Sequence, residues 1–323
     1  MLLKRLTDCF GVSGREGEVR ELIREEASGF ADEVYTDVLG NLIAHKKGGG
    51  KKIMLAAHMD EIGVAVTYID ESGFLRFAPI GGVYTKRLLN RRVCFKNGTV
   101  GVIDTEAENK DLKLAKMFID IGAPDRKSAD ELVSIGDMAA FCGSFEQSGD
   151  MVISKALDNR AGCYTLIRAL QRASCENDLY FCFTSQEEVG LRGAKAAVYS
   201  VAPDYALAVD VTDTGDTPGC EKMAVKIGGG AAVKIMDRSV ITHPEVRDIL
   251  FDEAKKNTIP YQLEVMTEGG TDAGAIHIGR SGVKTGGISI PTRYIHSPSE
   301  MVSMNDIDAC IDLVCAFCEH KFD

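Results

Sequence analysis

The sequence predicts an α/β fold that is interrupted by a small β-rich insert, and three observations support this prediction. Short apolar runs of strand length alternate with amphipathic helical segments over residues 1–63 and again over 148–323. Residues 64–147 instead contain short β-like runs separated by turns, with few helix signals. The composition, with 45% hydrophobic and 26% charged residues, is typical of a globular protein. We therefore expect a discontinuous host domain, 1–63 and 148–323, and an inserted domain, 64–147.

Charge and hydropathy narrow the classes of partner. The 323 residues include 37 Lys and Arg against 48 Asp and Glu, a formal net charge of −11, which argues against binding nucleic acid or an anionic membrane surface. No apolar run approaches membrane-spanning length, and the first residues lack the apolar stretch of a signal peptide. The ten cysteines are scattered through expected strands and helices, and core packing is favoured even for the CxxC pair Cys315 and Cys318. A cytoplasmic protein with reduced thiols is expected.

Helices are expected where apolar residues recur at helical spacing after a start signal. Ser13 and Glu16 have the form of a capping box ahead of the first such segment. Pro244, after Thr242-His243, is a second start signal. Helices are thus expected after Ser13, Asp158, Gly190, Thr242 and Gly270, and over Asp306–Cys318.

Strands are expected where about four to eight apolar or β-branched residues are bounded by turns. In the host these are Glu33–Ala44 (a pair broken at Gly40-Asn41), Ile53–Ala57, Val152–Leu157, Leu179–Thr184, Tyr205–Val209, Lys226–Met236 and Val283–Ile290. In the insert they are Val64–Ile69, Leu75–Pro79, Arg92–Lys96, Thr99–Ile103, Met117–Ile121 and Met138–Phe145, with one helix at Lys127–Val133.

Several candidate functional residues stand where an expected strand ends or a loop begins, which is where open α/β sheets gather ligands. Each has a simpler alternative: a histidine at a strand end can be structural, Asp158 can be a helix N-cap, and two adjacent glutamates can be a surface pair. The candidates are His58, Asp60, Asp158, Glu187, Glu188, Asp210 and His296.

Together, two of these imidazoles and three of the carboxylates are the mixed ligands that suit Zn²⁺ and its first-row relatives. If Asp158 bridges two metals through its two oxygens, each metal can receive three protein ligands and keep an open position for water. Two metals about 3.5–4 Å apart would lower the pKa of that water and polarise a substrate carbonyl. Glu187, beside Glu188, would then act as the general base. Asp60 is expected to accept a hydrogen bond from the ring nitrogen of His58 that faces away from the metal.

Six motifs carry a resemblance to the M42 family of metallo-aminopeptidases, which includes the tetrahedral TET aminopeptidases. They occur in the family's order over nearly the whole chain: AAHMDEIG (56–63), KALDNRAG (155–162), TSQEEVGLRGA (184–194), AVDVT (208–212), GGTDAGAI (269–276) and SIPTRYIHSP (289–298).

The resemblance implies a mixed-sheet α/β/α metallopeptidase domain interrupted by a dimerisation domain. It implies one Zn²⁺ or Co²⁺ held by His58, Asp158 and Asp210 and a second held by Asp158, Glu188 and His296. Glu187 becomes the general base and Asp60 the residue that orients His58. Dimers would assemble into a homododecamer, and the substrates would be peptides with a free N-terminus.

Two other functions remain open from the sequence. A related amidohydrolase, such as a deacylase, would use the same metal centre, and a catalytically silent, self-assembling shell protein would keep the metals for stability alone. A glycosidase is a weaker alternative, because two carboxylates flanking a sugar bond need no histidine-bound metals.

Overall fold

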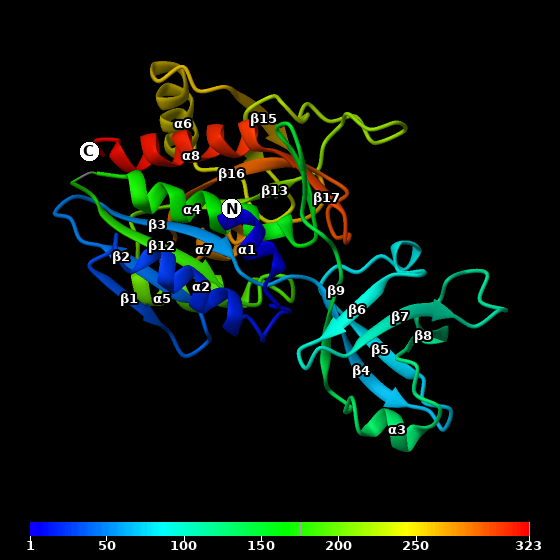
Figure 1. Cartoon of the computed structure of the whole chain (residues 1–323). Coiled ribbons are helices and arrows are strands. Elements are labelled where there is room, and N and C mark those ends of the chain that lie inside the picture. The colour runs from blue at the N-terminus through cyan, green and yellow to red at the C-terminus, as the bar shows by residue number, and fades with distance from the viewer. Residues whose placement is uncertain (175, 323) are drawn as a thin grey trace.

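The computed structural model describes residues 1–174 and 176–322 of the chain. It has two lobes, a host built on an 11-stranded sheet and a smaller closed barrel (Figure 1). The host sheet contains both parallel and antiparallel strand pairs, and helices pack on both of its faces. The predicted fold class, a mixed-sheet α/β/α host with a small β-rich insert, is therefore confirmed.

Four adjacent parallel strands form the centre of the host sheet. They are β12 (Asp178–Thr184), β3 (Lys52–His58), β13 (Tyr205–Thr212) and β16 (Lys284–Arg293), in that order. Their near-continuous apolar sequences are typical of parallel strands that are buried on both faces. The outer strands are β1 (Glu33–Thr36) and β2 (Leu42–Lys46) beyond β12; β17 (Glu300–Ser303), β11 (Met151–Ser154) and β10 (Glu146–Ser148) beyond β16; and a branch from β16 through β14 (Ala231–Met236) to β15 (Tyr261–Val265).

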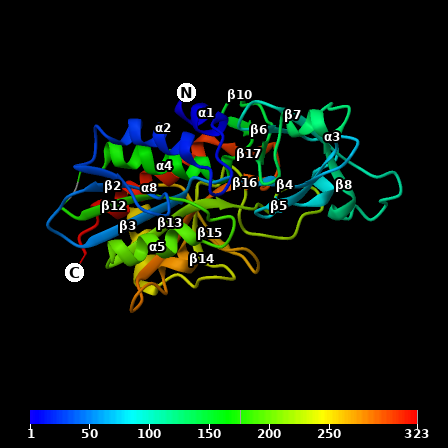
Figure 2. The same ribbon diagram turned by 90° about the horizontal axis from the view of Figure 1, so that it is seen from below.

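The alternation of side chains along β3 shows how the sheet divides the core. Ile53, Leu55 and Ala57 pack on one face, whereas Met54 and Ala56 pack on the other. Figure 2 shows the layers from the side, with α2 and α4 on one side of β3 and α5 on the other. The first face is covered by α1 (Leu2–Asp8), α2 (Gly17–Ala27), α4 (Leu157–Arg172), α6 (Pro244–Lys256) and α8 (Met304–Glu319), and the second by α5 (Arg192–Val201) and α7 (Ala273–Ile276).

The barrel has a hydrophobic core of its own, which includes Val64, Leu75 and Ile119. Its strands follow one another around the barrel in the order β4-β5-β8-β7-β6-β9. The next strand, β10, already belongs to the host sheet. The elements of this lobe are β4 (Gly63–Ile69), β5 (Leu75–Ile80), β6 (Arg92–Phe95), β7 (Val100–Thr105), β8 (Met117–Asp120), β9 (Met138–Phe141), the helix α3 (Arg126–Asp130) and two 3-10 turns, η1 (Thr85–Arg87) and η2 (Leu114–Lys116).

The first amphipathic helix forms, but the capping box expected at its start is wrong. Glu16 is the N-cap of α2, and it makes no side-chain cap bond. The Ser13 hydroxyl instead donates to Asp60 Oδ2 at 2.6 Å, and the Glu16 carboxylate accepts the backbone N–H of Gln186 at 3.1 Å. Both side chains are therefore used to brace the ends of the central strands, and this tertiary use overrides the local capping signal.

The two longest described helices, α4 and α8, have 16 residues each. Cys315 and Cys318 are buried in α8 as members of the host core, which confirms that this CxxC pair serves packing. Among residues 1–174 and 176–322, no helix combines the length and the apolar character that crossing a membrane requires.

Candidate metal centre

The predicted site residues all lie together at the carboxyl edge of the central parallel strands. His58 is the last residue of β3, and Asp210 lies near the end of β13. This clustering follows from the topology, because neighbouring parallel strands present their carboxyl ends at one edge. The other members are Asp60 after β3, Asp158 at the start of α4, Glu187 and Glu188 after β12, and His296 in the loop between β16 and β17.

Two groups of three residues have the geometry of metal sites, and they share one carboxylate. The possible ligand atoms of His58, Asp158 and Asp210 lie within 4.8 Å of one another, and so do those of Asp158, Glu188 and His296. Asp158 Oδ1 is 3.1 Å from Nε2 of His58, and its Oδ2 is 3.2 Å from Nε2 of His296. Each oxygen of the shared carboxylate thus faces one imidazole.

The carboxylates of the cluster favour positive charge at His58 and His296. Burial lowers the pKa of His296, but its contacts with the carboxylates of Asp158 and Glu188 outweigh burial and raise this pKa to about 12. Burial likewise opposes the charged form of His58, and the nearby Glu187 and Asp210 again raise the pKa well above its ordinary value. A field that holds a proton on both imidazoles also attracts a cation that replaces those protons.

The residues present fit a pair of divalent cations. Seven buried carboxylates lie around the two imidazoles, and such an excess of desolvated negative charge is costly without counter-charges. Imidazole nitrogens combined with carboxylate oxygens are ligands that Zn²⁺ and other first-row metals accept. The seven carboxylates belong to Asp60, Asp158, Glu187, Glu188, Asp210, Asp272 and Glu300.

Glu187 is placed beside both groups but belongs to neither of them. Its side chain is only 11% exposed, and Oε2 lies 3.9 Å from Nε2 of His58. Burial, reinforced by the nearby Asp210 and Asp272, raises the pKa of Glu187 well above its ordinary value even though His58 opposes the shift. A carboxylate of raised proton affinity that is not one of the clustered ligands is suited to exchange protons with a bound molecule.

Asp60 lies beside the His58 ring with its main chain as well as with its carboxylate. Nδ1 of His58 lies 3.1 Å from the backbone oxygen of Asp60 and 3.5 Å from its carboxylate Oδ1. The Asp60 carboxylate accepts the backbone N–H of Glu187 at 2.9 Å and that of Glu188 at 3.2 Å, besides the Ser13 hydroxyl. Both its backbone oxygen and its carboxylate face Nδ1 of His58, and the carboxylate also holds the segment that carries both glutamates.

Two buried acids that belong to this region were not singled out from the sequence. Glu300 on β17 accepts the backbone N–H groups of Asp158 and His296, each at 2.9 Å. Asp272 accepts the Thr184 hydroxyl at 2.5 Å, and burial raises its pKa to about 7. Asp272 lies within the motif GGTDAGAI, which contributed only to the family resemblance, whereas Glu300 lies in a short segment with no strand pattern.

The site opens into a hollow of about 490 Å³ that both lobes line. The barrel contributes Gly82, Tyr84 and Arg87, which lie after β5 and in η1. A glycine is required at 82, because a Cβ there would lie 2.5 Å from Nδ1 of His296. The insert therefore approaches the candidate metal ligands closely and walls one side of the hollow.

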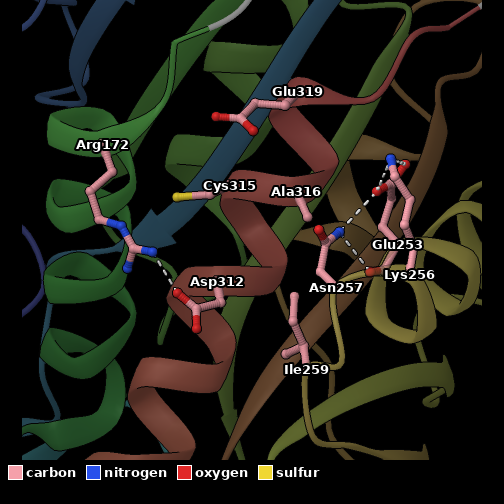
Figure 3. A pocket seen from close by; sticks show the side chains of 9 residues that line it. All are labelled: Arg172, Glu253, Lys256, Asn257, Ile259, Asp312, Cys315, Ala316 and Glu319. Atoms are coloured by element: carbon pink, nitrogen blue, oxygen red, sulfur yellow. Dashed lines mark hydrogen bonds and ion pairs between the residues drawn. The ribbon is translucent and has the colours of Figure 1, made fainter.

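A second hollow, of about 560 Å³, lies between α4, α6 and α8 and contains none of the predicted site residues (Figure 3). Four of its five charged groups pair with one another, and the fifth, Glu319, is exposed. Arg172 pairs with Asp312 at 2.6 Å, and Glu253 pairs with Lys256 at 3.0 Å and accepts a bond from Asn257. This hollow lacks the uncompensated buried charge that marks the candidate metal centre.

A mixed α/β/α host whose parallel strands end in a histidine–carboxylate cluster defines the class of this protein, a hydrolase with a candidate metal centre. Comparison with known proteins then identifies the family. Residues 40–313 match the model of the M42 peptidases, described as M42 glutamyl aminopeptidase, and the chain belongs to this family. It is an enzyme that hydrolyses peptide bonds. The resemblance seen in the six motifs is confirmed.

Individual relatives match over almost their full lengths. A putative aminopeptidase of Acetivibrio thermocellus is 56% identical over 317 residues, covering 97% of this chain and 96% of the relative. The lysyl aminopeptidase of Pyrococcus furiosus is 37% identical, covering 98% and 96%. Among solved structures, the aminopeptidase APDkam598 of Desulfurococcus kamchatkensis has a TM-score of 0.95 at 41% identity, covering 98% and 93%. The Pyrococcus horikoshii TET1 peptidase, described as able to assemble into a tetrahedron or a large octahedral shell, has a TM-score of 0.89 at 35% identity, covering 99% and 98%.

Proposed function

We propose that the chain is a metal-dependent aminopeptidase that removes N-terminal residues from short peptides. The single observation that carries the proposal is the shared Asp158, whose two oxygens each face one histidine within two overlapping groups of possible ligands. The family membership supports the reaction, because each of the four relatives described above is named as an aminopeptidase or a peptidase.

The proposed cofactors are two divalent ions per subunit, Zn²⁺ or Co²⁺. His58, Asp158 and Asp210 would hold one of them, and Asp158, Glu188 and His296 would hold the other. When bound, such ions supply Lewis acidity toward the scissile carbonyl and lower the pKa of a nearby water molecule.

The proposed catalytic work of the chain's own residues centres on Glu187. Its carboxylate takes a proton from the attacking water and returns that proton to the nitrogen of the leaving amine. Burial raises the proton affinity of this carboxylate and so makes it a stronger base than a glutamate in water. Asp60 fixes the backbone of Glu187 through the 2.9 Å bond to its N–H, which keeps the base in place during both proton transfers.

We further propose that residues 64–147 form an inserted dimerisation domain and that dimers assemble into a homododecamer. The barrel strands run from Gly63 to Phe141 and have a separate core, which supports an autonomous lobe. The TET1 relative, similar over 99% of this chain, supports a closed multi-subunit shell. A molar mass measured by light scattering tests the assembly, because a monomer at micromolar concentration would contradict it.

A cytoplasmic location is also proposed. Cys163, Cys182 and Cys310 are buried thiols without a disulfide. Such thiols are usual in a reducing compartment. Fractionation of the source cells, with a cytoplasmic marker followed in parallel, tests this location.

The experiment that tests the reaction uses one peptide in two forms, with a free and with an acetylated N-terminus. The protein is assayed before and after removal of metal by a chelator, and again after addition of Zn²⁺ or Co²⁺. The proposal expects release of the N-terminal residue from the free form alone, loss of this activity on chelation, and recovery with metal. Cleavage of the acetyl group would indicate a deacylase, and two bound metals without turnover of a broad peptide panel would indicate a silent shell protein. Activity that survives complete metal removal would contradict the metal dependence.

A further inference from the structure

Glu300 has a position that the proposed reaction does not account for. Its carboxylate is 2% exposed, and Oε1 accepts the backbone N–H of His296 while Oε2 accepts the backbone N–H of Asp158. The two bonded residues are 138 positions apart (296 − 158), so one side chain joins two distant segments of the site. Both of these residues belong to the group of possible ligands that also contains Glu188.

The main chain holds Glu300 firmly in this place. It lies on β17, which pairs with β11 on one side, where Ser154 is opposite Glu300, and with β16 on the other. His296, in contrast, lies in a loop and has a positive φ of 60°, a conformation that is unfavourable for a residue with a Cβ. The bond from its N–H to a strand-borne carboxylate holds this loop conformation in place.

Asp60 has the corresponding position on the other side of the site, since its carboxylate accepts the backbone N–H groups of Glu187 and Glu188. Two buried carboxylates thus fix the main chain at four of the proposed functional residues. They differ in which residues they fix: Asp60 serves the proposed base and one ligand, whereas Glu300 serves the shared ligand and His296.

We propose that Glu300 is a positioning residue that sets the separation of Asp158 and His296 and thereby the affinity of the metal position formed by Asp158, Glu188 and His296. The inference rests on the proposed function, because it assumes that two metals bind. It is specific to one of the two positions. The Glu300 carboxylate bonds neither His58 nor Asp210, so the position they form with Asp158 keeps two of its three ligands undisturbed.

The test replaces one oxygen of the carboxylate. In Glu300→Gln, the amide keeps one acceptor, but its NH₂ group faces a backbone N–H, so one of the two bonds is lost and replaced by a donor–donor contact. Asp306→Asn is a matched control, because Asp306 is 1% exposed and its carboxylate accepts the backbone N–H groups of Gly228 and Gly230 at 2.7 and 2.8 Å, away from the metal ligands. Both variants lose comparable bonds, but only one of them touches the site.

The measurement is titration of metal-free protein with Co²⁺, followed by the visible absorption of the bound ion and by the metal content after gel filtration. Wild type is expected to bind two equivalents. Glu300→Gln is expected to keep one and to bind the other about 10–100-fold more weakly, as is usual when a residue that supports a metal ligand is lost. Asp306→Asn is expected to bind both equivalents as wild type does.

Each outcome has a defined meaning. Two equivalents bound by Glu300→Gln with unchanged affinity, or the same weakening in Asp306→Asn, overturns the positioning role. Wild type that binds no Co²⁺ overturns the proposed function instead. If Glu300→Gln does not fold, Glu300→Asp, which keeps the charge but reaches only one N–H, is titrated in its place. Failure of both variants to fold while Asp306→Asn folds assigns Glu300 to fold stability and likewise overturns the inference.

Discussion

Replacing Glu187 by glutamine is the sharpest perturbation of the proposed mechanism. The substitution keeps the size of the side chain and removes its ability to accept a proton. The backbone bond from residue 187 to Asp60 does not involve the side chain and is retained. Because Glu187 lies outside both groups of possible ligands, the protein is expected to keep its full metal content.

The size of the effect follows from the surroundings of the carboxylate. Loss of a positioned general base typically reduces kcat by about 10²–10⁴-fold, which corresponds to about 2.7–5.4 kcal/mol of barrier. The Glu187 side chain is 11% exposed, so bulk water has little access with which to replace the lost base. We therefore expect a loss in kcat toward the upper end of this range, with KM changed little.

The assay compares kcat, KM and metal content of wild type, Glu187→Gln and Glu188→Gln on one free peptide. Glu188 is the matched control, because it lies next in sequence but belongs to the group with Asp158 and His296. Glu188→Gln should therefore lose bound metal as well as activity. Turnover of Glu187→Gln within threefold of wild type, or loss of its metal, would refute the assignment of the base.

Three further outcomes are expected. Asp60→Ala removes the acceptor of two backbone N–H groups of the Glu-Glu segment and should lower kcat by about 10–100-fold in steady-state assays; unchanged kcat would contradict its role. Asp216→Asn should cost about 1 kcal/mol in urea unfolding at pH 7, because Asp216 and Arg293 form a two-bond pair whose side chains are 22% and 27% exposed. The Arg293 bonds lower the pKa of Asp216 in the folded protein. The pair therefore stabilises the fold above the unfolded pKa of about 3.9, and this stabilisation is lost as pH falls through the lower folded pKa. A difference in unfolding free energy between wild type and Asp216→Asn that grows on acidification would be inconsistent with the pair. Leu207→Ala, in the fully buried centre of β13, should cost about 2–5 kcal/mol, whereas Val38→Ala at a fully exposed turn should cost less than about 0.5; equal effects would contradict the core assignment.

The sequence predicts the central strands well because their apolar runs and the polar residues after them are local features. Ile53–Ala57 and Leu179–Thr184 are each found within one residue or so of β3 and β12. The polar residues that end these runs converge because the sheet is parallel at its centre, so a local pattern carries long-range information there.

Features that depend on distant partners are not found in the same way. Ser13 has the spacing of a helix cap, but its hydroxyl bonds Asp60, 47 positions away, once the chain has folded. Strand β17 is only four residues long, and its Glu300 turns inward because β11 and β16 pair with it from both sides. A segment of four residues is too short to give a periodic signal for such pairing, so the contact of Glu300 with Asp158 was inaccessible from the sequence.

The two glycines at 81 and 82 allow the inserted lobe to lie against the candidate ligands of the host, since a Cβ at either position would come within 3 Å of Glu188 or His296. The hollow beside these candidate ligands consequently lies between the two lobes rather than along one of them. The volume of about 490 Å³ lies within the usual range of a small-molecule site, about 300–1,000 Å³. Because residues of both lobes line this hollow, any movement of the barrel against the host would change its shape beside Glu188 and His296.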